Sequence, residues 1–227
     1  MSAPASPTVR RRRLAAELRE IREDKGKSGD AVAAALRWSP SKISRYERAR
    51  TGLLQTEDYA RHIIGSYSRV EPMPPGMIGR MVKVRMRRQQ VLNREELELS
   101  VVLDESVLKR RIGDEPVMYE QLQRLVKEAD RPNLTLQILP LNAQHTVFGE
   151  SFVVFGFRDD SDAMLHDVVI TEQLRSSVTL EGERETYLHR IAFRSLSEAA
   201  LDPAASRELL LDTAESYWSG AWRRASA

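Results

Sequence analysis

The stretch SGDAVAAALRWSPSKISRYERAR, residues 28–50, carries the strongest structural signal in this chain of 227 residues. It reads as two short helices joined by a tight turn. Ser28 is a typical N-cap for the first helix, and Leu36 lies on its apolar side. Ser39 caps the second helix, and Pro40 takes its first position, where a missing N–H costs no hydrogen bond. The segment therefore predicts a helix-turn-helix.

The second of these helices carries cations on its outer faces. Ile43 and Tyr46, three residues apart, can anchor it in a small core, which leaves Lys42, Arg45 and Arg48 outside. A cation in the first turn, as at Lys42, opposes the helix dipole at a cost of a few tenths of a kcal/mol. An external polyanion explains that choice, and such a helix can read guanine edges in the major groove of DNA. The alternative is an amphipathic hairpin whose charges are simply solvated.

The charge of the chain is unevenly distributed along its length. Residues 1–52 contain 13 Lys and Arg against 6 Asp and Glu, whereas the remainder contains 22 against 27. A basic head on an acidic body is typical of a polyanion-binding module joined to a second part. Arg10 to Arg13 can serve as a basic arm on phosphates or as a solvated terminus, and both readings stay open.

Several classes of protein are disfavoured by composition and motif content. The absence of cysteine excludes disulfides, thiolate metal sites and cysteine catalysis. No apolar run approaches the ~20 residues of a membrane span. His145, His166 and His189 lack metal-ligand spacing, and we find no catalytic motif. We therefore expect a cytoplasmic protein that is not an enzyme, has no cofactor or metal and does not enter a membrane.

The remainder of the chain predicts a mixed architecture. The fold class is α+β, with a small all-α helix-turn-helix head followed by an α+β body that has a mostly antiparallel sheet. The apolar run at 151–157 predicts a central strand. The other expected strands are 98–104, 133–140, 167–171 and 177–180, and the expected helices are 77–92, 116–129, 182–196 and 203–218.

Two features of this body have alternative readings. The helix from Met77 contains Arg80, Lys83, Arg85, Arg87 and Arg88, which form a solvated face or contact DNA or an acidic partner, while Met77, Met81, Val84 and Val91 are expected in the core. Trp218 and Trp222 pack against helices or form a docking surface.

The predicted organisation has four parts. Residues 1–9 are expected to be disordered, and residues 10–51 to form a truncated helix-turn-helix DNA-binding head. Residues 52–95 are expected to form a helical connecting region, and residues 96–220 an α+β domain that binds a partner or a signal.

The head resembles the helix-turn-helix of the Xre (phage-repressor-like) transcriptional regulators. Residues Ser28, Val32-Ala33, Leu36, Ser39, Ile43-Ser44 and Glu47 match the family pattern in register. Gly29, Arg37 and Ala49 depart from the glutamine and the two glycines that are usual there. The resemblance implies that Ser41, Lys42, Ser44 and Arg45 face DNA, and Arg48 and Arg50 complete the set of predicted DNA-binding residues.

The rest resembles a C-terminal domain of unknown function common in actinobacterial antitoxin-like regulators, on strings such as GLLQTEDYAR (52–61) and VVLDESVLKR (101–110). The resemblance implies a sequence-specific DNA-binding transcriptional regulator. Double-stranded DNA would be its ligand, a homodimer its working form, and a small protein encoded nearby a further partner. The alternative is a protein-interaction adaptor whose shortened helix-turn-helix no longer binds DNA.

The head looks internally shortened by comparison with that family. The family has two more helices before GLLQTEDYAR, whereas here this string follows ERART directly. A head this small buries little surface alone. We therefore expect the helix from Thr56 to Tyr67 to pack under the first three helices, with Tyr59 and Ile63 supplying core contacts.

Overall fold

A computed structural model describes residues 52–69, 72–94, 96–145, 151–156, 167–172 and 177–219. They fall into two compact units, one with the described residues between 52 and 145 and between 188 and 219, the other with those between 151 and 187. The first unit contains helices α4 (Glu57–Tyr67), α5 (Met77–Arg88), α6 (Ser106–Lys109), α7 (Glu115–Ala129) and α9 (Pro203–Thr213), the 3-10 turn η1 (Gln89–Asn93), the π-helical turn η2 (Ala214–Trp218), and strands β1 (Leu99–Asp104) and β2 (Leu134–Leu139). The predicted head lies outside the described residues.

The two strands of the first unit pair in parallel. Leu99 lies opposite Leu134, and the register continues to Asp104 opposite Leu139. The prediction of an α+β body is confirmed, and these two strands form its parallel part, whose pairing the sequence did not specify. Between them the chain runs through α6 and α7, and a crossover of that length returns the second strand in the direction of the first.

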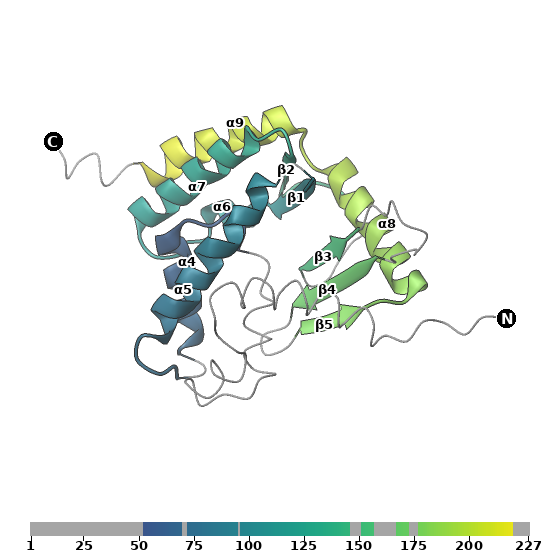
Figure 1. The fold of residues 1–227 in the computed structure, drawn as a ribbon. Helices are drawn as coiled ribbons and strands as arrows, with labels where there is room; N and C mark the ends of the chain where they lie inside the picture. The colour runs from purple at the N-terminus through teal and green to yellow at the C-terminus, as the bar shows by residue number, and fades with distance from the viewer. Residues whose placement is uncertain are drawn as a thin grey trace. The chain divides into compact units, whose positions relative to one another are not determined.

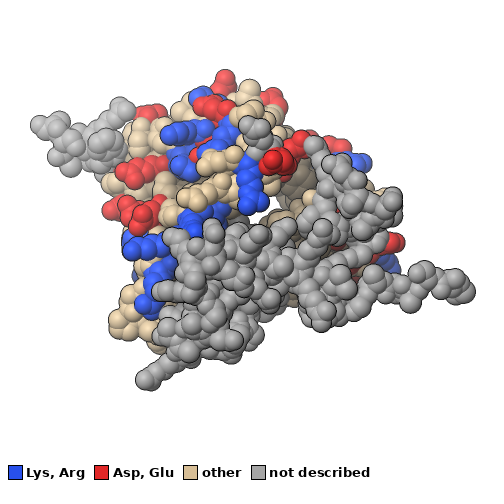
Figure 2. Space-filling model, in the orientation of Figure 1, with Lys and Arg blue, Asp and Glu red and all other residues tan. Residues whose placement is uncertain are grey.

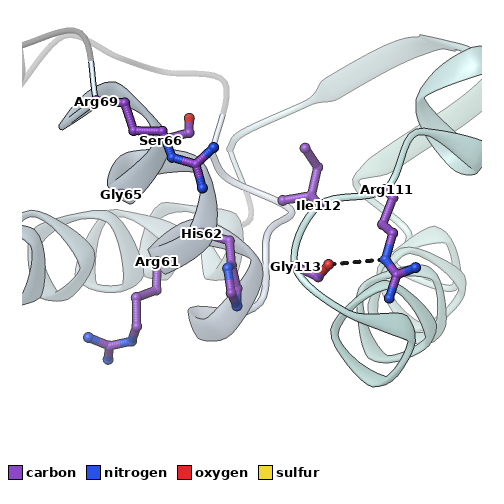
Figure 3. A pocket seen from close by; sticks show the side chains of 8 residues that line it. All are labelled: Arg61, His62, Gly65, Ser66, Arg69, Arg111, Ile112 and Gly113. Atoms are coloured by element: carbon purple, nitrogen blue, oxygen red, sulfur yellow. Dashed lines mark hydrogen bonds between the residues drawn. The ribbon is translucent and has the colours of Figure 1, made fainter.

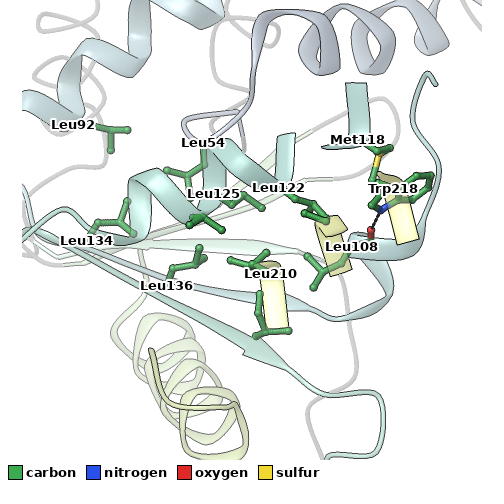
Figure 4. Close-up of a cluster of buried hydrophobic side chains, with 13 residues drawn as sticks. Leu54, Leu92, Leu108, Met118, Leu122, Leu125, Leu134, Leu136, Leu210 and Trp218 are labelled. Carbon is green, nitrogen blue, oxygen red and sulfur yellow. Dashed lines mark hydrogen bonds between the residues drawn. The ribbon is translucent and has the colours of Figure 1, made fainter. Parts of the chain in front are cut away.

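The hydrophobic core of this unit lies between the two strands and the helices α7 and α9 (Figures 1 and 4). Leu122 on α7, Leu136 and Ile138 on β2 and Leu210 on α9 are almost wholly buried. Asp114 caps α7 by accepting a hydrogen bond from the Val117 N–H, and Pro116 lies in the first turn of the helix that the sequence predicts over 116–129.

Trp218 closes the core from the last turn of the chain's final described helix. Only 3% of its surface is exposed, and its indole Nε1 donates to the carbonyl oxygen of Leu108 at 2.8 Å. The reading of Trp218 as a packing residue is confirmed. Trp222 lies outside the described residues.

The second unit contains an antiparallel sheet with the order β3-β4-β5, formed by Phe152–Phe155, Val168–Glu172 and Ser177–Leu180. The antiparallel prediction is confirmed here. The expectation that the 151–157 segment is central is wrong, because β4 holds that place and buries Val168, Val169 and Ile170. All four residues of β3 are only half-buried. Helix α8 (Glu183–Ala199) begins in this unit and ends in the other.

Helix α5 buries a different valine from the one that the sequence predicts. Met77 and Val82 are buried, as is Leu92 in η1, whereas Val84 is 45% exposed. Two residues along a helix correspond to a rotation of about 200°, so a helix that buries Val82 turns Val84 outward. The core assignment of Val84 is therefore wrong, and that of Met77 is confirmed.

Glu105 fastens the end of β1 to the segment after β2. Its carboxylate accepts hydrogen bonds from the Lys109 ammonium at 2.8 Å and from the Leu141 N–H at 3.0 Å. These bonds, chiefly the one from Lys109, hold the pKa of Glu105 below its usual value of 4.5. A carboxyl group with a lowered folded pKa stabilises the fold above that usual value and loses its contribution as the pH falls through the folded pKa.

We therefore expect Glu105→Gln to reduce the thermal stability at pH 7 and to differ progressively less from the parent as the pH falls from about 5 to about 3. Melting temperatures by circular dichroism at several pH values would measure this. The exposed Glu120→Gln on α7 is the control. A constant difference between Glu105→Gln and the parent across the range would contradict the assignment.

Candidate nucleic-acid interface

The predicted DNA-binding residues Ser41, Lys42, Ser44, Arg45, Arg48 and Arg50 all lie outside the described residues. The described chain begins at Gly52, two residues after the last of them. The structure therefore shows how the chain leaves the predicted recognition helix. We name residues 52–56, Gly-Leu-Leu-Gln-Thr, the joint.

A single amide side chain on α7 pairs with the backbone of the joint. Gln121 is 5% exposed. Its Oε1 accepts from the Thr56 N–H at 2.8 Å, and its Nε2 donates to the Leu54 carbonyl at 2.9 Å. One glutamine thus satisfies a donor and an acceptor of the joint, and Leu54 itself enters the core beside it.

Side chains from α5 and η1 hold the other side of the joint. Gln89 Nε2 donates to the carbonyls of Gly52 at 2.9 Å and Gln55 at 2.6 Å, and Arg85 Nη1 donates to Gln55 Oε1 at 2.7 Å. A Cβ added at Gly52 would overlap the side chain of Arg85, so any other residue at this position would force Arg85 to shift. The joint is consequently fastened to the body over its whole length.

Gln121 should be necessary for this fastening. Replacement by leucine keeps the bulk but leaves the Leu54 carbonyl and the Thr56 N–H without this partner, at a cost of about 1–3 kcal/mol in the free energy of unfolding. Urea denaturation would measure the loss, and hydrogen exchange at the Thr56 amide should accelerate. Gln90→Leu, at an exposed neighbour of Gln89, is the matched control. An unchanged Thr56 exchange rate in Gln121→Leu would contradict this role.

Helix α4 follows the joint directly and starts where the sequence predicts. Thr56 is its N-cap, with a side chain that accepts from the Tyr59 N–H. Ala60 and Ile64 are buried, and Ile63 is half-buried. The described contacts of α4 are to α5 and α7, and the packing of the head on α4 stays a prediction because the head lies outside the described residues.

Tyr59 lies on the side of α4 that packs against the core. Burial raises the pKa of its phenol, and the nearby Arg110 cation opposes this shift. The phenol is therefore neutral at physiological pH and acts as a packing group.

A cleft of about 320 Å³ lies between the C-terminal half of α4 and the segment before α7 (Figure 3). It is lined by Arg61, His62, Gly65, Ser66, Arg69, Arg111, Ile112 and Gly113. All of these residues belong to one compact unit. The lining contains three guanidinium groups and no carboxylate, a composition that favours anions.

The basic residues of α5 divide into two kinds. Arg80 and Lys83 are exposed, in agreement with a solvated face, whereas Arg85 is half-buried and holds the joint. On the face shown in Figure 2, the described residues carry cationic and anionic side chains beside one another. On that face the described body therefore carries charges of both signs. The sequence of the head, in contrast, is predominantly basic.

The described part of the chain contains no group of three or more His, Asp or Glu side chains placed to hold a metal ion. His145 and His189 belong to it, whereas His166 does not. None of its helices is both long and apolar enough to cross a membrane.

The joint and the cleft were missed by sequence reasoning. Gln121 gave a usable signal, because a glutamine between Met118 and Leu122 on the inner side of α7 needs a polar partner. No pattern in the sequence indicates the cleft, because its lining residues Arg69 and Arg111 are far apart in sequence.

Comparison with protein families gives two matches. A helix-turn-helix domain matches residues 13–63, and a domain of unknown function, DUF5753, matches residues 41–212, more than half of the chain. Both matches include the joint and the first half of α4. Neither the curated proteins nor the solved structures contain a match to this chain.

Proposed function

The chain belongs to the DUF5753 family and has a helix-turn-helix domain at its N-terminal end, and we propose on this basis that it is a sequence-specific transcriptional regulator. The helix-turn-helix domain indicates DNA binding and transcription regulation. The finer assignment, an Xre-type and antitoxin-like regulator without catalytic activity that works in the cytoplasm, is part of the proposal.

The match over residues 13–63 is the observation that carries this function, because it covers every residue assigned to DNA. In the proposed complex the helix from Pro40 lies in the major groove. Ser41, Lys42, Ser44 and Arg45 contact base edges, and Arg48 and Arg50 contact phosphates.

The body would act on the head through the joint. The joint separates Arg50 from α4, and its hydrogen bonds to Gln121, Gln89 and Arg85 support a fixed connection rather than a free linker. A partner protein or signal that displaces α5 or α7 would therefore move the chain directly behind the recognition helix. A small protein encoded nearby is the partner that the antitoxin-like assignment implies.

The proposed working form is a homodimer. One short recognition helix contacts only a few base pairs, and two helices on paired half-sites bind much more tightly than one. The operator would then consist of two half-sites related by two-fold symmetry.

Selection of bound sequences from a random duplex pool with the full chain tests the proposal. We expect a two-fold symmetric site, with affinity that falls by about 0.9 log units per log unit of salt for each phosphate contact. Binding with no enriched sequence and no steep salt dependence would exclude the regulator and leave the adaptor as the function.

A further inference from the structure

Helix α8 carries large apolar side chains on a side that no described part of the chain covers. Of its 17 residues only Thr186 is buried. Tyr187, Leu188 and Ile191 are 63%, 52% and 40% exposed. Thr186 and Ile191 are five residues apart, which is about 140° around the helix, so they lie on its inner and outer sides. Apolar side chains that gather on one exposed side of a helix indicate a contact surface.

The exposed side of α8 has the spacing of a coiled-coil seam. Five exposed residues lie three, four, three and four positions apart, namely Arg184, Tyr187, Ile191, Arg194 and Glu198. A repeat of 3.5 residues keeps one side of a helix against a partner helix along its whole length. We name these five residues the α8 seam. They belong to one continuous helix, so their arrangement depends on the geometry of α8 alone.

The charges of the α8 seam are placed symmetrically about Ile191. Arg184 lies seven residues before it and Glu198 seven residues after it, about 10 Å away along the helix axis in each direction. The two charged side chains are therefore about 21 Å apart on their own helix, too far to pair with each other. No described residue forms an ion pair with either of them. With a cation at one end and an anion at the other, the seam is complementary to a reversed copy of itself.

We propose that α8 packs against α8 of a second copy of this chain, antiparallel and with the two Ile191 side chains in contact at a two-fold axis. Arg184 of each copy then faces the partner's Glu198, which gives two ion pairs at the ends of the interface. Arg194 lies beside the partner's Tyr187, so its guanidinium can stack on the phenol ring. The proposal rests on the proposed function in one respect, because it supplies the interface of the proposed homodimer.

Sedimentation equilibrium of the full chain over a range of concentrations is the direct test. The parent should dimerise reversibly. Ile191→Glu brings two carboxylates together at the axis and should raise the dimer dissociation constant by about tenfold or more. Val84→Glu is the matched control, because it makes the same kind of change at a valine on α5 that is 45% exposed, and it should leave the constant unchanged. Both positions are exposed, so both variants should fold, which circular dichroism would check.

Exchange of the charges tests the antiparallel arrangement. Arg184→Glu and Glu198→Arg should each raise the dissociation constant by about two- to thirtyfold, because each removes both ion pairs of the dimer. The double variant with both changes restores opposite charges in each pair and should return the constant close to that of the parent. If the two residues only stabilised their own helix, this recovery would not occur, because they are too far apart to interact within it.

A parent that stays monomeric at every concentration would overturn the α8 interface and leave the exposed side chains to a different protein. An Ile191→Glu variant that dimerises like the parent, or a double charge variant that does not recover, would overturn it as well. If the parent dimerises as expected but selects no duplex, the proposed regulator fails and the α8 interface stands. If the parent selects a symmetric duplex and Ile191→Glu leaves dimerisation unchanged, the regulator stands and the α8 interface fails.

Discussion

Replacing Lys42 and Arg45 together by alanine should abolish the site preference of the chain and lower its affinity for the selected duplex by about thirtyfold or more. Each well-placed contact between a cationic side chain and a base edge contributes about 1–3 kcal/mol of discrimination. Two contacts together correspond to about 2–6 kcal/mol, and every 1.4 kcal/mol is a factor of ten in affinity. Fluorescence anisotropy on the selected duplex and on a scrambled one would measure both quantities.

The control for this pair is Arg94→Ala with Lys127→Ala, which removes two positive charges from exposed positions of the body. This control should lose little affinity and keep the ratio between the two duplexes. If the Lys42→Ala, Arg45→Ala variant kept the parent's preference for the selected duplex over the scrambled one, the helix that begins at Pro40 would not be the element that recognises the base sequence. This would hold even if the variant still bound DNA.

Trp218→Ala should give the largest loss of stability of any single change in the described body, about 3–5 kcal/mol in the free energy of unfolding. The indole is 3% exposed within the core cluster, and its removal leaves a cavity and an unpaired Leu108 carbonyl. Trp218→Phe should lie between the parent and the alanine variant, since it keeps an aromatic ring but cannot donate. Urea unfolding followed by far-ultraviolet circular dichroism would measure these differences.

Tyr217 offers a matched control next to it. Its ring makes an edge-to-face contact with Trp218 at 4.8 Å between centroids, but 55% of the residue is exposed. Tyr217→Ala should therefore cost less than about 1.5 kcal/mol, the upper value for such an aromatic pair. Similar destabilisation by the alanine variants at 217 and 218 would show that Trp218 does not organise the core.

The sequence predicted best those elements whose signals are local. The start of α4 at Thr56, the proline at the start of α7, and the alternation of apolar residues in β2 each specify their element within a few residues. The parallel pairing of β1 with β2 was missed because strand direction depends on the path of the crossover, which the strands do not encode. The place of β3 at the sheet edge was missed because an apolar run of four to seven residues does not reveal its neighbours.

The candidate site was predictable only in its DNA-binding half. The helix-turn-helix pattern is a short local motif, and the family match supports it. The joint depends on pairing between residues more than 30 positions apart in one case and more than 60 in another, Gln89 with Gln55 and Gln121 with Leu54. Propensity and periodicity describe windows of about 15 residues, so a contact of that range stays invisible to them.

The joint also limits how this protein can be recombined with its relatives. A chimera cut inside residues 52–56 would place foreign backbone against Gln121 and Gln89, and any β-carbon at position 52 would collide with Arg85. Because the two family matches share residues 41–63, no boundary between them leaves both intact. A grafted head should therefore end before Gly52 and keep the native sequence from there through α4.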